Sequence, residues 1–320
     1  MQAEITRTEA RTIDTATSPS DLNAQTVAAY LELADLRPKS RATYERALRQ
    51  FVRWLDGRGL AVNGLTADDV LQYRRDLELD HKPGTVNLYM SAVRGLYAWL
   101  NERTGYPNVA RGVRGVSGSG TSMSMEHDAL SVEQARRVAA HSDGDDLESL
   151  RNHAIVNLMI RVGLRTIEVV RANVGDLRTV AGRTALFVHG KGRAEAREFV
   201  MLDEAALAPI SEYLRARGRV ADDDPLFAGV GNRNRGRLTT RTVSRVAKRA
   251  MEAEGVTGPH FCAHSLRHTA ATLALMGGAP VEEVQSMARH ASVATTMIYV
   301  HSISRAKGVA ERSVSAMLAG

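Results

Sequence analysis

The chain has 320 residues, enough for two modest domains, and its hydrophobic fraction of 44% is ordinary for a folded soluble protein. Its formal net charge of +6 favours a polyanionic partner, because cations that contact phosphates release counterions. The single cysteine, Cys262, excludes an intramolecular disulfide and a cysteine zinc cluster, and no apolar run is long enough to span a bilayer. Between Phe261 and Ala263, Cys262 itself is expected to be a buried structural thiol.

Residues 1–21 predict a flexible lead-in, because they are polar and show no helical stripe. They also lack the apolar core of a signal peptide. We therefore expect a cytoplasmic protein of a prokaryote, with no membrane partner. The lead-in is too short to form a DNA-binding domain of its own.

Residues 22–111 predict a small helical domain. Apolar residues recur at helical spacing over 39–55 and 85–101, and Thr66 with Asp69 forms a capping box that opens a helix between them. The side chains expected in the core are Leu48, Phe51, Val52, Leu55, Val70, Tyr73, Leu77, Leu88, Ala92, Leu96 and Leu100. The opposite face of the first helix is basic and carries Arg41, Arg46 and Arg49.

Residues 112–126 predict a linker, because glycine and serine at this density behave as flexible coil. The second domain, residues 127–320, is expected to be mainly helical with a small β-hairpin. The expected helices cover 131–140, 147–161, 204–217, 240–254 and most of 264–318, with a break at 277–280. The expected strands, 184–188 and 197–202, are joined by a turn that contains Gly190, Lys191 and Gly192.

The most informative pattern is His264-Ser265-Leu266-Arg267-His268, followed by His290 and Tyr299 and preceded by Arg165 and Lys191. Cations and imidazoles around one phenol indicate metal-free chemistry on a phosphodiester. Arg165 and Arg267 can clamp its oxygens, since guanidinium groups keep their charge and present a planar fork. In this interpretation His264 is the base, Lys191 the acid for the departing 5′ oxygen, and Tyr299 the nucleophile.

Metal sites are the alternative interpretations of these residues. His264 and His268 stand one helical turn apart, as a zinc pair would, but a neighbouring glutamate and a third ligand are missing. Two acidic clusters, Asp143-Gly144-Asp145-Asp146 and Asp222-Asp223-Asp224, would suit a metal nuclease, yet solvated loop charge explains them better. We therefore expect neither a metal nor another cofactor.

These motifs resemble the tyrosine recombinases, which include phage integrases, Xer-type recombinases and Cre, over residues 22–320. The matching segments are His264–His268, Gly163–Glu168 as the first arginine box, His189–Gly192 as the hairpin lysine, and Thr295–Tyr299. The resemblance implies an N-terminal SAM-like core-binding domain and a C-terminal catalytic domain. It also implies that Tyr299 forms a 3′-phosphotyrosyl link on a phosphate bound by Arg165 and Arg267. His264, His290 and Lys191 would then serve proton transfer and oxygen binding, with Glu168 and His268 in support.

One position departs from the family pattern, because Arg289 stands where the family commonly has glycine before the last histidine. We expect its side chain to crowd the turn and to make the placement of His290 less certain. The departure also favours a mobile-element integrase or excisionase over a housekeeping Xer enzyme.

The resemblance further implies double-stranded DNA as partner at a core attachment site. Four protomers on two duplexes would exchange strands through a Holliday junction without metal or ATP, and the free chain would be a monomer or weak dimer. An accessory directionality factor fits this scheme. The corresponding family helix contacts DNA, so Arg241, Arg245 and Lys248 on 240–254 are expected to bind it, although a solvated basic face explains them too. The tail over 303–318 either packs on its own domain or docks on the next subunit.

Other functions remain open at this point. An Xer-type resolvase of chromosome or plasmid dimers would carry the same motifs. A type IB topoisomerase shares the chemistry, and a DNA-binding regulator could retain the site without using it. The small helical N-terminal domain, the tail and the intact set of six residues favour recombination.

Overall fold

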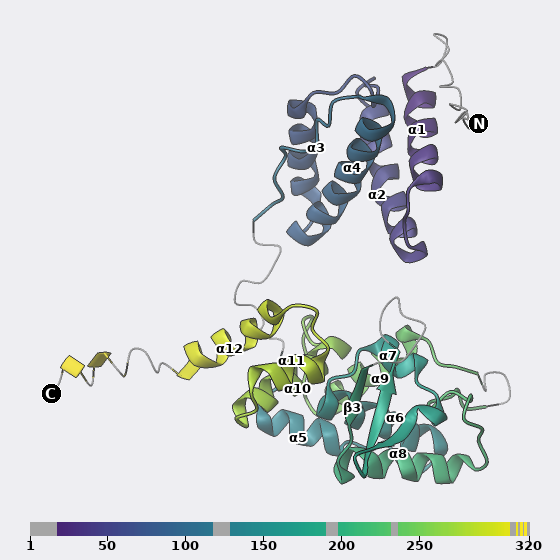
Figure 1. The fold of residues 1–320 in the computed structure, drawn as a ribbon, viewed down its shortest axis with the longest axis vertical. Helices are drawn as coiled ribbons and strands as arrows, with labels where there is room; N and C mark the ends of the chain where they lie inside the picture. The colour runs from purple at the N-terminus through teal and green to yellow at the C-terminus, as the bar shows by residue number, and fades with distance from the viewer. Residues whose placement is uncertain are drawn as a thin grey trace, which may run out of the picture. The chain divides into compact units, whose positions relative to one another are not determined.

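The computed structural model describes residues 18–117, 129–189, 198–231, 236–307, 312, 314, 315, 317 and 318. The chain divides into two units, Met1–Gly120 and Thr121–Gly320 (Figure 1). No helix in the described ranges combines the length and the apolarity that a membrane span requires.

The described part of the first unit consists of helices packed around one aromatic core. These helices are α1 (Pro19–Leu33), α2 (Pro38–Asp56), α3 (Ala67–Asp80) and α4 (Pro83–Thr104). Proline occupies the first turn of α1, α2 and α4, where its missing N–H costs nothing, and the predicted capping box of Thr66 and Asp69 opens α3. The ring of Phe51 contacts those of Trp54, Tyr73 and Tyr97 at centroid distances of 6.2, 4.8 and 6.4 Å.

Helix α1 was missed in part, because the predicted lead-in ran to residue 21 whereas the helix begins at Pro19. The apolar stripe of α1 is weak in the sequence, because one of the residues that this helix buries, Asn23, is polar. Asn23 is fully buried, and its amide donates to Asp56 Oδ1 at 3.0 Å and to the Leu60 carbonyl at 2.9 Å. It also accepts a hydrogen bond from the Val62 N–H at 2.7 Å. One polar side chain therefore fixes α1 against the turn that follows α2.

Two further details of the first unit differ from expectation. Leu88 is 41% exposed, because the buried face of α4 is formed by Val86, Met90 and Val93 and is rotated away from it. The predicted linker begins later than residue 112. Val113 is buried in the core of this unit, and the backbone of Val116 exchanges two hydrogen bonds with the side chain of Asn87. Residues 118–126 of the predicted linker lie outside the described residues.

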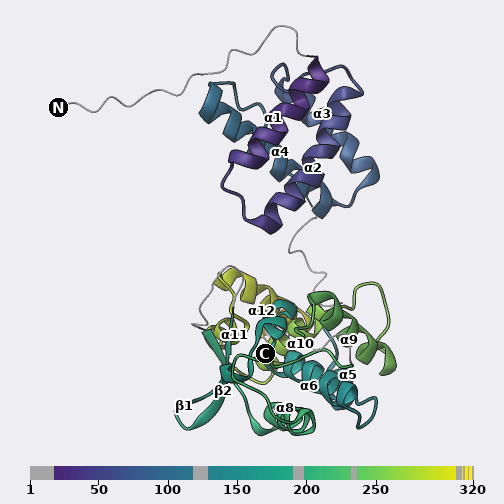
Figure 2. The ribbon, with the colours of Figure 1, turned by 90° about the vertical axis from the view of Figure 1, so that its right-hand side faces the viewer.

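The second unit is built around the buried helix α6 (Leu147–Val162), which contacts helices on several sides (Figure 2). Its neighbours are α5 (Val132–Ala140), α8 (Glu204–Arg217), α9 (Thr240–Ala253) and α10 (Ala263–Met276). Ile155, Leu158 and Met159 of α6 are fully buried. The helices predicted over 131–140, 147–161, 204–217 and 240–254 are confirmed to within about two residues at their ends, whereas the stretch predicted after residue 280 is broken again between Ala288 and Val293.

The sheet has a strand that the sequence did not reveal. Its order is β1 (Leu177–Val180), β2 (Arg183–Val188) and β3 (Glu198–Met201), antiparallel throughout, with Leu186 opposite both Leu177 and Val200. Strand β1 is short, and its two central residues, Arg178 and Thr179, are exposed, so its sequence carries no apolar alternation. The predicted turn between β2 and β3, with Lys191, lies outside the described residues.

Helices α7 (Thr166–Arg171), α11 (Val281–Ala288) and α12 (Val293–Lys307) complete the described fold, and α10, α11 and α12 pack against one another. Gly277 ends α10 and Pro280 precedes α11, as predicted. Beyond α12, Val314, Met317 and Leu318 are helical and 58, 83 and 83% exposed, so these apolar side chains do not pack on their own unit.

Candidate active site

The structure brings together site residues that lie far apart in the sequence. Arg165 precedes α7, Arg267 and His268 lie on α10, His290 precedes α12, and Tyr299 lies on α12. All of them belong to the second unit, and Lys191, the other residue expected at this site, lies outside the described residues.

Arg267 is held by backbone carbonyls at the ends of two helices. Its Nη1 donates to the Gly163 carbonyl at 2.6 Å, and its Nη2 donates to the Ala288 carbonyl. Gly163 ends α6 in the left-handed conformation (φ 65°), and this turn directs its carbonyl at the guanidinium. Burial, together with the charges of Arg165 and Arg289, lowers the pKa of Arg267 to about 9. The site therefore holds a guanidinium with very little water around it, where its charge acts strongly on an anion.

Glu168 is fully buried and is shared by two arginines. Arg165 Nη1 donates to its Oε1 at 2.7 Å, and the Arg165 backbone N–H donates to its Oε2 at 2.8 Å. Arg289 Nη2 donates to Oε2 at 2.6 Å, and Arg289 Nε to Oε1 at 3.2 Å. Burial alone would raise the pKa of Glu168, but the hydrogen bonds and charges of Arg289 and Arg165 lower it overall. Glu168 is thus an anion that orders guanidinium groups.

Arg289 does not crowd the turn, which corrects the expectation from the sequence. Its backbone adopts the left-handed region (φ 51°, ψ 49°), and its side chain folds inward, where it is 2% exposed. The following N–H, of His290, donates to the Gln285 carbonyl at 3.1 Å, so the turn is closed in the usual way. Sequence reasoning missed Arg289 as a site residue. Two features of the sequence could have indicated its role. An arginine stands at a position that favours glycine, and the acidic residue Glu168 is available to pair with it.

Tyr299 is 4% exposed and lies between two imidazoles. Its phenol hydrogen-bonds to Nδ1 of His268, and its ring stacks on that of His290 at a centroid distance of 6.0 Å and an interplanar angle of 4°. Burial raises the pKa of Tyr299 to about 12, although Arg267 and Arg165 oppose the shift. Tyr299 is therefore a neutral phenol, which could act as a nucleophile only with a group that accepts its proton.

The two imidazoles beside Tyr299 are also neutral. Burial lowers the pKa of His268 to about 3 and that of His290 to about 4, and neighbouring positive charges add to both shifts. His290 Nδ1 lies 2.9 Å from Thr296 Oγ1, which fixes its ring. His264, the base expected from the sequence, is exposed, and its ring centroid lies 4.2 Å from that of His268. His268, and not His264, is the imidazole that hydrogen-bonds to the phenol oxygen of Tyr299.

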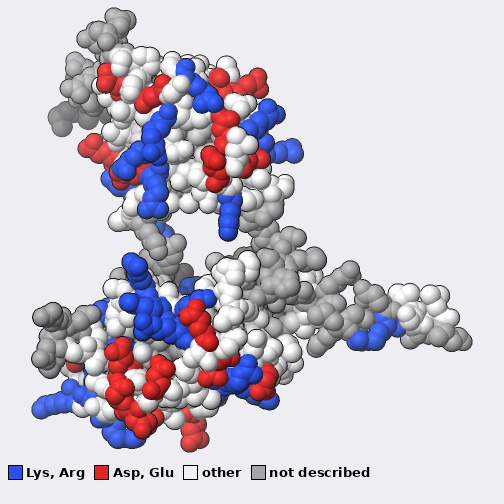
Figure 3. Space-filling model, turned by 180° about the vertical axis from the view of Figure 1, so that it is seen from behind, with Lys and Arg blue, Asp and Glu red and all other residues white. Residues whose placement is uncertain are grey.

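The residues expected to contact DNA lie on exposed helix faces, with one exception. Arg41, Arg46 and Arg49 of α2 are exposed, as are Arg241 and Arg245 of α9. Figure 3 shows Lys and Arg side chains gathered on one edge of the second unit, in the part of the view where α9 lies. Lys248 differs, because its ammonium donates to the carbonyls of Gly258 and Phe261 at 3.0 and 3.2 Å.

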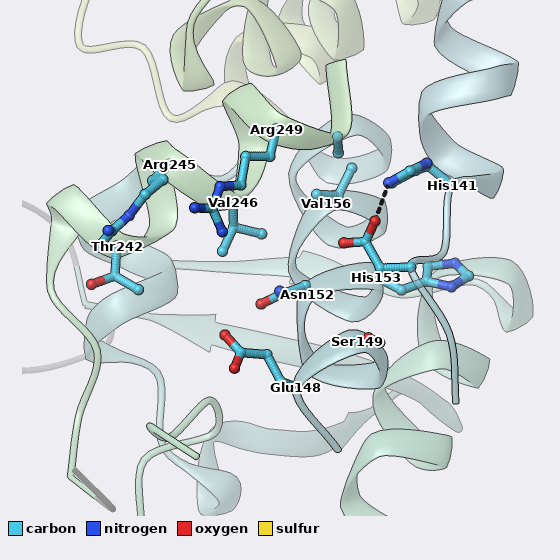
Figure 4. Close-up of a pocket in the computed structure, with 12 residues that line it drawn as sticks. His141, Glu148, Ser149, Asn152, His153, Val156, Thr242, Arg245, Val246 and Arg249 are labelled. Atoms are coloured by element: carbon cyan, nitrogen blue, oxygen red, sulfur yellow. Dashed lines mark hydrogen bonds and ion pairs between the residues drawn. The ribbon is translucent and has the colours of Figure 1, made fainter. Parts of the chain in front are cut away.

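A separate polar cavity of about 200 Å³ lies between α6 and α9 (Figure 4). Arg245 and Arg249 project into it from α9 and face Glu148 and Asn152 of α6. His141, at its edge, lies 3.1 Å from Asp143 and 2.9 Å from Glu254. This cavity contains none of the residues that surround Tyr299.

The acidic clusters and the cysteine have local roles. Asp146 caps α6 by accepting from the Glu148 and Ser149 N–H groups, and Asp224 accepts from the Ala221 N–H. In the described ranges, no group of three or more His, Cys, Asp or Glu side chains is arranged to hold a metal ion. Cys262 is exposed, so its expected burial is wrong. It occupies the N-cap of α10, where the chain enters the helix at the surface.

Comparison with known proteins follows the same division of the chain. Residues 128–305 match the family described as "Phage integrase family", and residues 24–104 match "Phage integrase, N-terminal SAM-like domain". The predicted fold class and family resemblance are thereby confirmed.

Relatives and solved structures agree with these matches. The tyrosine recombinase XerC of Corynebacterium efficiens is 37% identical over 164 residues, which cover 51% of this chain and 50% of that protein. The tyrosine recombinase XerC of Pelobacter propionicus is 30% identical over 272 residues, which cover 83% of this chain and 86% of that protein. The crystal structure of the XerH site-specific recombinase bound to palindromic difH substrate, a post-cleavage complex, superposes with a TM-score of 0.72. It is 20% identical, covers 92% of this chain and 86% of that one, and so shows the shared fold.

Proposed function

Because the chain belongs to the phage integrase family of tyrosine recombinases, we propose that it breaks and rejoins DNA strands at specific sites through Tyr299. The observation that carries the proposal is the position of the Tyr299 phenol. It lies against a neutral imidazole, beside a buried guanidinium, and in a cluster whose charge suits a phosphate.

The chemistry is an exchange of one phosphate ester for another. The Tyr299 oxygen attacks the phosphorus while its proton passes to Nδ1 of His268, and a 3′-phosphotyrosyl bond forms as the bond to the 5′ oxygen breaks. Lys191 is proposed to protonate that oxygen. Arg165 and Arg267 stabilise the charge that develops on the non-bridging oxygens. The new ester keeps the energy of the broken bond, so a second 5′ hydroxyl can reverse the step without ATP.

His268 is the proton acceptor in this scheme because of its position. Its low pKa keeps Nδ1 unprotonated at neutral pH, and a bound phosphodiester adds a negative charge that stabilises the imidazolium. His290 stacks on the other face of the phenol and is proposed to assist oxygen binding. His264, exposed at the entrance of α10, is proposed to contact the phosphate.

The partner is proposed to be a double-stranded core site gripped by both units, in the cytoplasm of a bacterium. Four protomers would act on two duplexes through a Holliday junction, with the exposed tail docking on the next subunit. Two biological roles compete. Arg289 was the reason to favour a mobile-element integrase, but its buried contacts within the site explain its presence without reference to that role. The relatives named XerC favour resolution of chromosome or plasmid dimers as the second candidate.

The test is covalent capture on a nicked suicide substrate in EDTA, read on a denaturing gel. One substrate carries a candidate attachment site from the flanks of the gene, and another carries a dimer-resolution site from the same genome. We expect a protein–DNA band with the wild type and none with Tyr299→Phe, although that variant still shifts the DNA. Tyr213→Phe, which removes another buried phenol of the same unit, is the matched control and should retain the band. A gel shift without a covalent band in the wild type would favour a regulator.

A further inference from the structure

In the described part of the site, Arg289 is the arginine whose three guanidinium nitrogens all donate hydrogen bonds to other residues. Its Nε and Nη2 donate to Glu168, its Nη2 also donates to the Gly163 carbonyl at 3.2 Å, and its Nη1 donates to the Met287 carbonyl. Its side chain is 2% exposed, and a phosphate could bind it only by displacing one of these protein acceptors. Arg165, in contrast, keeps 34% of its side chain exposed. Of these two partners of Glu168, Arg165 is the one whose side chain keeps surface open to a phosphate.

The contacts of Arg289 converge on Arg165. The side chain of Arg289 donates to Glu168, and the backbone carbonyl of Arg289 accepts a hydrogen bond from Arg165 Nη2 at 2.9 Å. The two Nη atoms of Arg165 are therefore directed to two different acceptors, Glu168 and the Arg289 carbonyl. Without the Arg289 side chain, Glu168 would lose two donors, and Arg165 would be free to turn both Nη atoms to the carboxylate as a bidentate pair. That rotation would withdraw Arg165 from a phosphate.

Charge supports the same conclusion. Arg165, Arg267 and Arg289 oppose the single buried carboxylate of Glu168, so the cluster is strongly positive where charge builds up on a phosphodiester under attack. An arginine in a left-handed backbone conformation is strained, and burial of its charge is costly, so such a residue persists where its contacts compensate for both.

We propose that Arg289 is a positioning residue for strand cleavage, which holds Glu168 and thereby keeps Arg165 oriented for the scissile phosphate. The inference rests on the proposed function. It assigns Arg289 an effect on the rate of cleavage and not on the affinity for DNA, because each of its guanidinium nitrogens already donates to a protein acceptor.

The experiment measures single-turnover cleavage of the suicide substrate and DNA affinity in parallel. Arg289→Gly removes the side chain and also relieves the backbone strain. We expect cleavage to slow by about 10- to 100-fold, with DNA affinity changed by less than about twofold. Arg289→Lys, which retains the charge without the fork, should be intermediate. Arg136→Met, at an exposed arginine of the same unit, controls for loss of charge.

Two further measurements test the route through Glu168. The double variant Glu168→Gln/Arg289→Gly should cleave within about twofold of Glu168→Gln alone, since residues that act through one another are not additive. Millimolar guanidinium added to Arg289→Gly should restore part of the rate, because the vacated space faces Glu168. Full additivity, or a glycine variant as fast as the wild type, would overturn the inference. If the wild type forms no covalent band, the proposed function fails and the inference fails with it.

Discussion

The phenol of Tyr299 on α12 hydrogen-bonds to Nδ1 of His268 on α10, and both side chains are buried. The proposed nucleophile is thus hydrogen-bonded to an imidazole that can accept its proton. Both partners are neutral, because burial raises the pKa of the phenol and lowers that of the imidazole. In the proposed mechanism the phenol therefore passes its proton to the imidazole as it attacks, and no phenolate forms beforehand.

His268→Asn should slow cleavage by about 100-fold or more, because the phenol loses its proton acceptor. A substrate with sulfur in place of the bridging 5′ oxygen separates this role from that of Lys191, since a thiolate leaves without a proton. We expect that substrate to rescue Lys191→Met and not His268→Asn. Rescue of both variants, measured as single-turnover rates, would contradict the assignment of His268 as base.

The second unit should lose stability as the pH falls from about 6.5 toward 4. His268 has a pKa of about 3 in the folded protein, below its ordinary value of 6.5, so in this window the unfolded chain binds a proton that the folded chain does not. Its contribution is complete above pH 6.5 and declines by up to about 1.4 kcal/mol per pH unit below it. His290 acts in the same direction. Urea unfolding followed by circular dichroism should show this slope, reduced in His268→Gln.

Arg245 and Lys248 should respond differently to the same substitution, although both lie on α9. Arg245→Gln should weaken DNA binding and reduce the slope of log Kd against log salt by about 0.9, the value for one lost phosphate contact. Lys248→Gln should leave the slope unchanged, because its ammonium already donates to two carbonyls. Fluorescence anisotropy at several salt concentrations measures both. Equal slopes for Arg245→Gln and wild type would place the DNA away from this face.

Asn23→Ala should destabilise the first unit by about 2–3 kcal/mol, since it leaves a buried N–H and a buried carbonyl without partners. Both tryptophans of the chain, Trp54 and Trp99, lie in this unit, so tryptophan fluorescence during urea unfolding reports on it alone. Asn63→Ala, at an exposed asparagine of the same unit, should cost less than about 0.5 kcal/mol. A similar loss from both variants would show that burial of Asn23 is not what matters.

The sequence predicted the parts of the site that are set by local order. The string from His264 to His268 lies on one helix, α10. Arg165 directly precedes α7, the first helix after Gly163. Both patterns can therefore be recognised from residue types and their spacing along the chain. Periodicity likewise predicted α2, α4 and α9, whose apolar residues recur at helical spacing.

Features that depend on distant partners could not be predicted in this way. Arg289 is compatible with its turn because Glu168, 121 residues earlier, is buried beside it. Asn23 stabilises α1 through groups more than 30 positions along the chain, so a polar residue replaces the apolar one that a stripe would require. The contact of His268, and not His264, with Tyr299 depends on how α12 packs across α10, which spacing along one helix does not specify.

The exposed thiol of Cys262 has a practical consequence for anyone who handles this protein. It is the only cysteine in the chain, so any disulfide must join two separate molecules. A preparation exposed to air without reductant would accumulate disulfide-linked pairs, which a gel run without reductant would show as a band of twice the mass. The same thiol accepts a single maleimide dye at the entrance of the catalytic helix, two residues before His264, without any engineered cysteine.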